Sequence, residues 1–414
     1  MREKRHKHRI SNPVQYLKRG EIVSMRVKDV LIKETGAKRM FPGQRHSLDT
    51  VERPTIDYGR DGATWEKSGE TEPPKSHRDL SARCAQLKRY DVADSLVYFL
   101  DGSRHIYKVD DIAFSKNKRI SVYPVLAGQI GVGCCKRSNR VMKKHRFSFE
   151  CVLALPDLAD ADGRAGFSSA LVQKLNEIEA VQRRGIHFGH IFFYDTSKPS
   201  DEWKQIGRNF YESRGTSKIQ DRMIWLEQEM VRNLVKEHLL DQDHYLIKDG
   251  SLEYRGLKRG DAAGVTAEML HQEQYEWVLG VSKNFNPEVC KDQNGKSNPG
   301  FIAELPFCHR TPAAMYEWSG VRYAVWYLRL REAERTRSIF DGVVKVKKIL
   351  VGDEVEKGMD TERIDDLSAR ILNERNPVCY GSDLRWANHL YPIYLTEQFI
   401  KARYIPNESF LQMF

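Results

Sequence analysis

Two stretches of the 414-residue chain end in the same tripeptide, Asp-Gly-Ser, directly after an apolar run. Asp101 follows YFL, and Asp249 follows LIK. An aspartate at the end of a buried strand, followed by a glycine turn, places its carboxylate at the rim of a sheet, where α/β proteins commonly bind ligands. Asp-Gly-Ser is also an ordinary turn sequence. Two copies after two apolar runs leave both a turn and a functional site open.

A glutamate between them supplies a third carboxylate. Residues 221–240 have helical periodicity, and Glu227 falls on the apolar face of that helix, whereas Glu229 falls on its polar face. A carboxylate on a core-facing stripe is costly unless it has a partner. Glu227 is therefore either one half of a buried polar pair or a metal ligand.

Asp101, Glu227 and Asp249 would together form a set of hard oxygen ligands. Mg²⁺ and Mn²⁺ prefer such ligands, and zinc does not. Two such ions about 4 Å apart activate a water molecule and stabilise the attacking and leaving oxygens of a phosphodiester. The three acids therefore predict a phosphodiester hydrolase that uses Mn²⁺ or Mg²⁺, with two ions as its cofactor.

The predicted elements form a mixed sheet flanked by helices. Apolar runs at 96–100, 119–133 and 147–155 predict three consecutive strands, the first ending at Asp101. Further strands are predicted at 186–194, 244–250, 277–283, 322–330 and 342–350, and helices at 168–183, 221–240, 361–373 and 393–403. A meander followed by alternating helices and strands indicates an α/β fold. This order agrees with a ribonuclease H-like fold.

The positive charge is concentrated at the start of the chain. Of a net charge of +10, about nine belong to residues 1–45, which hold 13 Lys or Arg and 4 Asp or Glu. Residues 1–85 are polar and rich in turn formers, which predicts an irregular, partly ordered basic arm in front of a body at 86–414. The arm is either a solvated tail or a contact for nucleic acid or an acidic partner.

Composition excludes several classes of protein. No window approaches 18 apolar residues, so no membrane span is predicted, and no apolar segment follows the basic start as in a secretory signal. The seven cysteines form no CxxC pair, which argues against a zinc site and a disulfide framework. A reducing cytoplasm is the expected location.

Several short motifs, taken in order, resemble those of the NurA nuclease family. They are YFLDGSR (98–104), RMIWLEQEM (222–230), YLIKDGSL (245–252), WVLGVSK (277–283), HRTPAA (309–314), WYLRL (326–330) and YPIYL (391–395). The resemblance spans roughly residues 90–400 and implies that residues 86–414 form a NurA-like domain. It implies a ribonuclease H-like core, manganese-dependent DNA cleavage, a homodimer and a HerA-type hexameric ATPase as partner.

The resemblance also assigns roles by position. Asp101, Glu227 and Asp249 match metal-binding and catalytic residues, and Tyr391 matches the catalytic tyrosine of a carboxy-terminal Tyr-Pro motif. Glu229 is the alternative to Glu227 if the alignment is shifted. The resulting expectation is a DNA nuclease that works in DNA end processing or in defence against foreign DNA.

One departure from the family leaves a second function open. The family usually has a histidine about eight residues after the tyrosine, where this chain has Gln398 and Phe399. His389 lies on the other side of the motif. The alternative is therefore a catalytically weak DNA-binding adaptor that assembles with the ATPase.

Three basic residues are candidates for nucleic-acid binding. Lys283 ends the motif WVLGVSK, Arg310 lies in HRTPAA, and Arg329 lies in WYLRL. Positive side chains at the groove of a nuclease commonly contact phosphates. Each is equally well explained as a salt-bridged or snorkelling residue.

Overall fold

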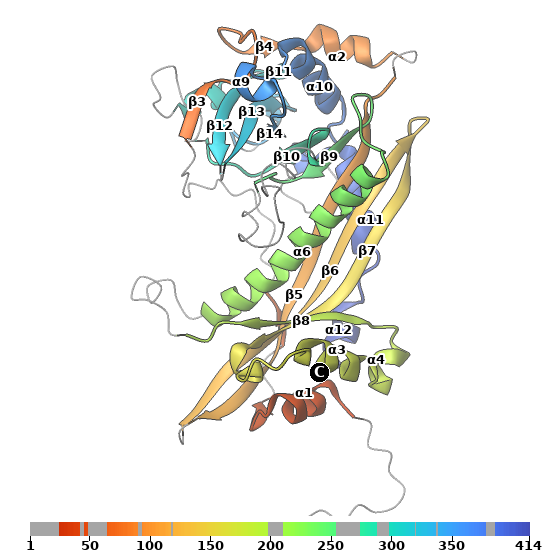
Figure 1. Ribbon diagram of the computed structural model, residues 1–414. Coiled ribbons are helices and arrows are strands. Elements are labelled where there is room, and N and C mark those ends of the chain that lie inside the picture. The colour runs from red at the N-terminus through yellow and green to blue at the C-terminus, as the bar shows by residue number, and fades with distance from the viewer. Residues whose placement is uncertain are drawn as a thin grey trace, which may run out of the picture.

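One mixed sheet runs the length of the molecule (Figure 1). The structure is a computed structural model that describes residues 25–41, 45–48, 64–89, 93–116, 119–197, 210–253, 274–287, 298–318, 320–336, 338–377 and 386–414. In this part of the chain the sheet has 14 strands, and its main path is β3-β12-β13-β14-β10-β9-β5-β6-β7-β8. Helices flank it, which confirms the predicted α/β class with a mixed sheet.

The first three predicted strands form a long antiparallel meander. They are β5 (Leu96–Lys116), β6 (Arg119–Ser138) and β7 (Val141–Pro156). Asn139 and Arg140 join β6 to β7 with φ of 50° and 63°, which is the left-handed turn that suits a twisted hairpin. The prediction that the first strand ends at Asp101 is wrong. Its Asp-Gly-Ser tripeptide continues the strand, because these residues pair with Gly131–Gly133 of β6.

The second Asp-Gly-Ser copy does end a strand. β9 (Tyr245–Asp249) lies parallel to both β5 and β10 (Val278–Ser282), and Gly250 turns the chain with φ +86°. Beyond β10 follow β14 (Val343–Ile349), β13 (Val321–Arg329) and β12 (Ala314–Trp318), all antiparallel to their neighbours. At the other end of the sheet, β8 (Phe188–Tyr194) lies parallel to β7.

Three of the longer helices match predicted ones. They are α6 (Phe210–Lys236), α10 (Thr361–Asn373) and α11 (Tyr391–Lys401). α6 crosses the meander in Figure 1 and starts 11 residues before the predicted 221–240. The added turns carry a glycine and many polar residues, but the buried Ile219 packs into the core, and such tertiary contacts override weak helix propensity.

The predicted helix 168–183 is two helices, α3 (Phe167–Asn176) and α4 (Glu179–Arg183). The Asn176 side chain explains the break. Its amide donates to the Phe188 carbonyl at 2.9 Å and accepts from the Phe188 N–H at 2.8 Å, as a neighbouring strand would. These two bonds tie the end of α3 to the first residue of β8.

Residues 25–89 join the body through several small elements. These elements are α1 (Val27–Thr35), β1 (Arg39–Phe41), β2 (His46–Ser47), β3 (Thr64–Ser68), β4 (Arg78–Asp79) and α2 (Ser81–Leu87). β1 and β2 pair with β5, β3 pairs with β12, and β4 pairs with β11 (His309–Arg310). The sequence predicted an irregular arm that ends at residue 85. Through these pairings, residues of the segment are part of the sheet. Residues 1–24 lie outside the described part.

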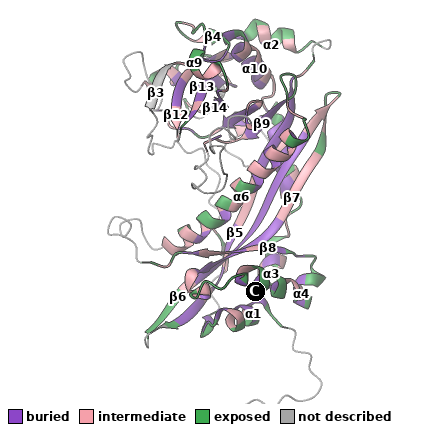
Figure 2. Ribbon diagram, in the orientation of Figure 1, coloured by how far each residue is buried: buried purple, intermediate pink, exposed green. Residues whose placement is uncertain are grey.

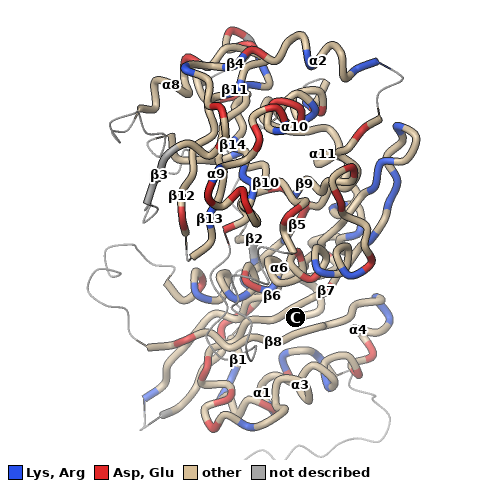
Figure 3. The backbone as a smooth tube through the Cα atoms, turned by 45° about the horizontal axis from the view of Figure 1, so that its top comes forward, with Lys and Arg blue, Asp and Glu red and all other residues tan. Residues whose placement is uncertain are grey.

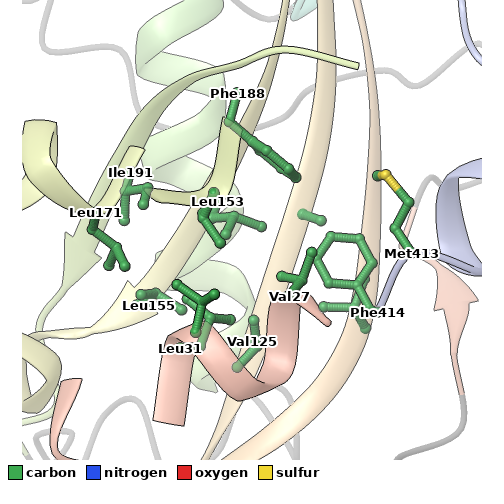
Figure 4. Close-up of a cluster of buried hydrophobic side chains, with 14 of the residues drawn as sticks. Val27, Leu31, Val125, Leu153, Leu155, Leu171, Phe188, Ile191, Met413 and Phe414 are labelled. Carbon is green, nitrogen blue, oxygen red and sulfur yellow. The ribbon is translucent and has the colours of Figure 1, made fainter. Parts of the chain in front are cut away.

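Both ends of the described chain enter one apolar cluster. Val27 and Leu31 of α1 contact a set that includes Met413 and Phe414 (Figure 4). Buried residues lie along most strands of the sheet, whereas the first residues of β6 and β7 are exposed or half-buried (Figure 2). The remaining elements are η1 (Asp157–Asp160), α8 (Pro299–Ala303), η3 (Ala333–Arg335), α9 (Glu354–Lys357), η4 (Trp386–Asn388) and α12 (Asn407–Leu411). None of the described helices is long and apolar enough to cross a membrane.

Candidate active site

A pocket opens where one edge of β5 is uncovered. β9 pairs with this edge as far as Leu100, and β2 pairs with it again from Tyr107. No described strand pairs with the edge between these two points. The pocket there has a volume of about 690 Å³ and is lined by Ser47, Leu48, Asp101, Gly102, Ser103, Arg104, His105, Thr216, Gln220, Met223, Asp249, Lys283, Glu397, Lys401 and Asn407.

Asp101 faces the side of the sheet that α11 covers. It pairs directly with Gly133, and paired residues of neighbouring strands point to the same face. A Cβ atom on Gly133 would lie 2.8 Å from Ile400, and one on Gly131 would lie 2.5 Å from the same side chain. The two glycines let α11 approach the sheet closely. As a result Glu397 of α11 lines the same pocket as Asp101.

Glu227 lies on the opposite face. A Cβ atom on Gly102 would clash with the Glu227 carboxylate, and successive residues of a strand point to opposite faces. Glu227 is 5% exposed, so the apolar face of α6 buries it as the sequence indicates. Asp101 and Glu227 therefore approach the edge of β5 from two sides of the sheet.

Of the acids Asp101, Glu227, Asp249 and Glu397, all but Asp101 form an ion pair with a lysine. Lys283 Nζ lies 2.9 Å from Asp249 Oδ2, Lys248 Nζ lies 2.8 Å from Glu227 Oε2, and Lys401 Nζ lies 2.7 Å from Glu397 Oε1. Asp101 is 5% exposed and forms no side-chain hydrogen bond or ion pair within the described part of the chain, although the charge of Lys283 acts on it from a distance. A buried carboxylate without a partner is costly. Asp101 is therefore the acid that has most to gain from a bound cation.

The environment of Asp101 favours its neutral form. Burial raises the pKa of this carboxyl well above its ordinary value, and the charge of Asp249 raises it further. Glu397 and Glu227 act in the same direction, whereas Lys283 opposes them. Nearby negative charge destabilises a carboxylate, and nearby positive charge stabilises it. A divalent cation beside Asp101 would therefore favour its ionised form.

The pKa values of the other three acids shift in different directions. Burial alone would raise the pKa of Asp249 and Glu397, but Lys283 and other nearby positive groups bring both pKa values below their ordinary range. Burial raises the pKa of Glu227, and Lys248 offsets only part of that rise. Lys283 forms its ion pair with Asp249, and its charge also acts to lower the pKa of Asp101 and Glu397, which line the same pocket.

The pocket contains carboxylate oxygens that could bind a metal ion, but they are not grouped closely enough to form a complete set of ligands. In the described part of the chain, no three His, Cys, Asp or Glu side chains converge closely enough to hold an ion. The placement of Glu227 on the opposite face accounts for part of this. The chemistry nevertheless fits Mn²⁺ or Mg²⁺, because Asp101, Asp249 and Glu397 offer hard carboxylate oxygens to one pocket.

Two predicted residues of the Tyr-Pro region lie apart from the pocket lining. The prediction that Tyr391 is part of the site is not supported by its position, since the side chain is 42% exposed and does not line the pocket. His389 is 1% exposed and close enough to lower the pKa of both Asp249 and Glu397 when charged. Neither Glu227 nor Glu229 of α6 lines the pocket, and Glu227 is buried whereas Glu229 is half-buried.

Arg310 and Arg329 are not in contact with the pocket. Arg310 is 0% exposed and forms ion pairs with Glu70 and Asp365. Arg329 is 1% exposed and donates to backbone carbonyls, including those of residues 303 and 339. The expectation that they bind nucleic acid is corrected here, because both guanidinium groups are enclosed and already have partners. Lys283 does lie in the pocket.

Sequence reasoning missed Glu397 and its partner Lys401. The signal was available, since Glu397 lies four residues after the buried Ile393 and three before the buried Ile400. This spacing places a carboxylate on the apolar stripe of a helix, which is the pattern that singled out Glu227.

Comparison with known proteins gives limited similarity. No family model matches the chain, and no curated protein matches it. The fold is similar to the crystal structure of the NurA nuclease from Sulfolobus solfataricus, with a TM-score of 0.37 and 9% sequence identity. That match covers 80% of this chain and 89% of the other.

Proposed function

We propose that this pocket is the active site of a metal-dependent DNA nuclease. The observation that carries the proposal is the buried Asp101 carboxylate, which has no ion-pair partner in the described chain and faces a pocket shared with Asp249 and Glu397. The ordered NurA-like motifs of the sequence supply the substrate class, which is DNA. An open strand edge gives an extended substrate room to reach these acids.

The side chains around the pocket have distinct roles in this proposal. Asp101, Asp249 and Glu397 would hold Mn²⁺ or Mg²⁺, which when bound activates water and stabilises phosphodiester charge. Lys283 and Lys401 place positive charge on the wall, suited to orienting phosphate oxygens. Glu227 and Lys248 form a buried pair behind Gly102 that supports the backbone next to Asp101.

A cleavage assay tests the proposal. Purified protein is incubated with end-labelled single- and double-stranded DNA in Mn²⁺, in Mg²⁺ and in EDTA. Asp101→Asn and Asp249→Asn should each reduce Mn²⁺-dependent cleavage by about a hundredfold or more, since even residues behind a metal ligand commonly contribute 10–100-fold. Asp243→Asn, an exposed aspartate outside the pocket, is the matched control. Full cleavage in both active-site variants, or in EDTA, would refute the assignment.

One observation favours a second candidate, the catalytically weak DNA-binding adaptor. Lysines already neutralise Asp249, Glu227 and Glu397, which lowers the net negative charge available to attract metal ions. An adaptor would bind DNA and show no cleavage at millimolar Mn²⁺. It would also be unaffected by Asp101→Asn in binding assays.

The expected partners are part of the same proposal. A homodimer, a HerA-type hexameric ATPase, and a role in DNA end processing or in defence against foreign DNA rest on the motif resemblance. Co-purification with such an ATPase, followed by cleavage assays with and without ATP, tests the partnership. No increase in cleavage on adding the ATPase and ATP would count against it.

A further inference from the structure

A row of aromatic rings crosses the sheet from the outer edge of β7 to the pocket. β8 pairs with β7 only from Cys151 onward, and no described strand covers β7 before that residue. In order of contact, the row consists of Phe399 of α11, Phe147 and Phe149 of β7, Tyr404 and His105. Neighbouring ring centroids are 5.2, 6.4, 5.9 and 4.6 Å apart, in that order.

The row lies on the face of the sheet that carries Asp101. Phe147 pairs with Gly133 and Phe149 pairs with Gly131, the two glycines on which α11 rests. Both phenylalanine rings are half-buried, so part of each remains accessible beside α11. At the inner end, His105 lines the pocket itself. The row therefore leads from the outer edge of the molecule to the proposed active site.

Two exposed cations lie over the outer rings. Lys144 Nζ is 4.6 Å from the Phe399 ring centroid, and Arg403 Cζ is 5.5 Å from the same centroid and 6.0 Å from that of Phe147. Both residues are exposed. Figure 3 shows further Lys and Arg residues along the β6–β7 hairpin that forms this edge. Two rings of the row therefore lie beside positive charge.

Aromatic faces next to Lys and Arg match the chemistry of unpaired nucleotides. Bases stack on aromatic side chains regardless of sequence, and the phosphates between them pair with the cations. In duplex DNA the base faces are stacked on each other and cannot reach an aromatic side chain. Partly accessible rings therefore favour binding of a single strand. We propose that the Phe399–Phe147–Phe149–Tyr404 row binds one strand of DNA and leads it to the pocket. The destination of the strand rests on the proposed nuclease function, whereas the binding itself does not.

Binding without cleavage tests this inference. Fluorescently labelled single-stranded DNA is titrated with the full-length protein in EDTA at several salt concentrations, with fluorescence anisotropy as the readout. Phe147→Leu and Phe399→Leu keep apolar volume but remove the ring, and each should weaken binding about tenfold, since a stacked base contributes about 1–3 kcal/mol. Arg403→Ala should lower the slope of log affinity against log salt by about 0.7.

A matched cation–ring pair elsewhere is the control. Arg164 Cζ lies 3.6 Å from the Phe167 ring centroid, and its side chain is 47% exposed. Arg164→Ala should leave DNA binding unchanged. Melting temperatures of all variants show whether they are folded, and the exposed Arg403 tests the row even if a phenylalanine variant is unstable.

The outcomes separate this inference from the proposed function. Equal binding of single-stranded DNA by wild type, Phe399→Leu and Arg403→Ala would overturn the inference, even if the protein cleaves DNA. Absence of single-strand binding, or duplex binding that is equally tight and insensitive to the ring variants, would also overturn it. Ring-dependent binding by a protein that does not cleave DNA in Mn²⁺ would support the inference and refute the nuclease.

Discussion

At the residue scale, the Asp101 carboxyl couples stability to pH. Burial and the charge of Asp249 raise its pKa in the folded state. Between its ordinary pKa, about 3.9, and the raised value, the folded protein binds more protons than the unfolded chain. The contribution of Asp101 to stability is therefore largest below the ordinary pKa and is lost as pH rises through the raised pKa.

This gives a stability prediction for Asp101→Asn. In EDTA at pH 7 the variant should melt at a higher temperature than wild type, because the unfavourable buried charge is removed. The difference should shrink as pH falls toward 4. Thermal denaturation across this range measures it. A variant that is less stable than wild type at pH 7, with no dependence of the difference on pH, would contradict the proposed environment of Asp101.

The acids of the site could be predicted only in part from sequence. Asp101 and Asp249 both reach the pocket, but for different reasons, since one continues a strand and the other ends one. Glu227 was identified by its apolar surroundings, yet its side of the sheet depends on how α6 packs over Gly102. Periodicity shows which face of a helix is buried and cannot show which face of the sheet receives it.

At the element scale, the close approach of α11 to β6 determines where Glu397 lies. Gly133→Ala would place a methyl group 2.8 Å from Ile400 and push the helix outward. Overpacking of this kind costs about 1–3 kcal/mol. We expect this loss of stability in urea denaturation, together with weaker Mn²⁺ binding.

A glycine without such a neighbour is the matched control. At Gly300 of α8 a Cβ atom would lie 3.6 Å from Asn298, which is ordinary contact, so Gly300→Ala should not destabilise the protein and should leave Mn²⁺ binding unchanged. Equal behaviour of Gly133→Ala and Gly300→Ala would show that α11 has room to adjust and that Glu397 is not positioned by this contact.

Most elements could be predicted because an element buried on one face has a periodic apolar pattern, and a fully buried strand is a continuous apolar run. The strands later in the chain match their apolar runs closely, as 322–330 matches β13. In the far half of β5, polar residues interrupt the apolar pattern, although Tyr107, Val109 and Ile112 are buried in the core and the strand pairs with β6. The break after α3 depends on Asn176 bonding to Phe188, a contact between residues 12 apart that local patterns do not reveal.

At the scale of the whole molecule, a buried ion cluster joins the segment before β5 to the far end of the sheet. Arg310 pairs with Glu70, whose side chain is 0% exposed, and with Asp365 of α10. Arg310→Leu would leave two buried carboxylates without this partner. Breaking such a pair on one side costs about 3–5 kcal/mol.

Denaturation and limited proteolysis measure this effect. We expect Arg310→Leu to lower stability by that amount and to expose residues 64–89 to proteases. Arg183→Leu removes a highly exposed pair with Glu179 and should change stability by less than about 1 kcal/mol. If the two variants were equally stable, the cluster would not be what joins the segment to the body.

The net charge of +10 is unevenly distributed over the molecule. The sequence places most of it before residue 45, and the described part of that region belongs to the sheet and its apolar core. The proposed site depends instead on the local arrangement of acids and lysines around one strand edge, which composition cannot reveal. Only the folded chain brings Lys283 of the β10 end into the pocket that carboxylates of β5, β9 and α11 line.

Calorimetric titration of the metal-free protein with Mn²⁺, in the absence of DNA, tests the central claim most directly. The pocket should bind Mn²⁺ saturably, and Asp101→Asn should lose most of that affinity, while the exposed Asp243→Asn binds as wild type does. Binding that is absent in wild type, or equal in wild type and Asp101→Asn, would contradict a metal-dependent active site at this strand edge.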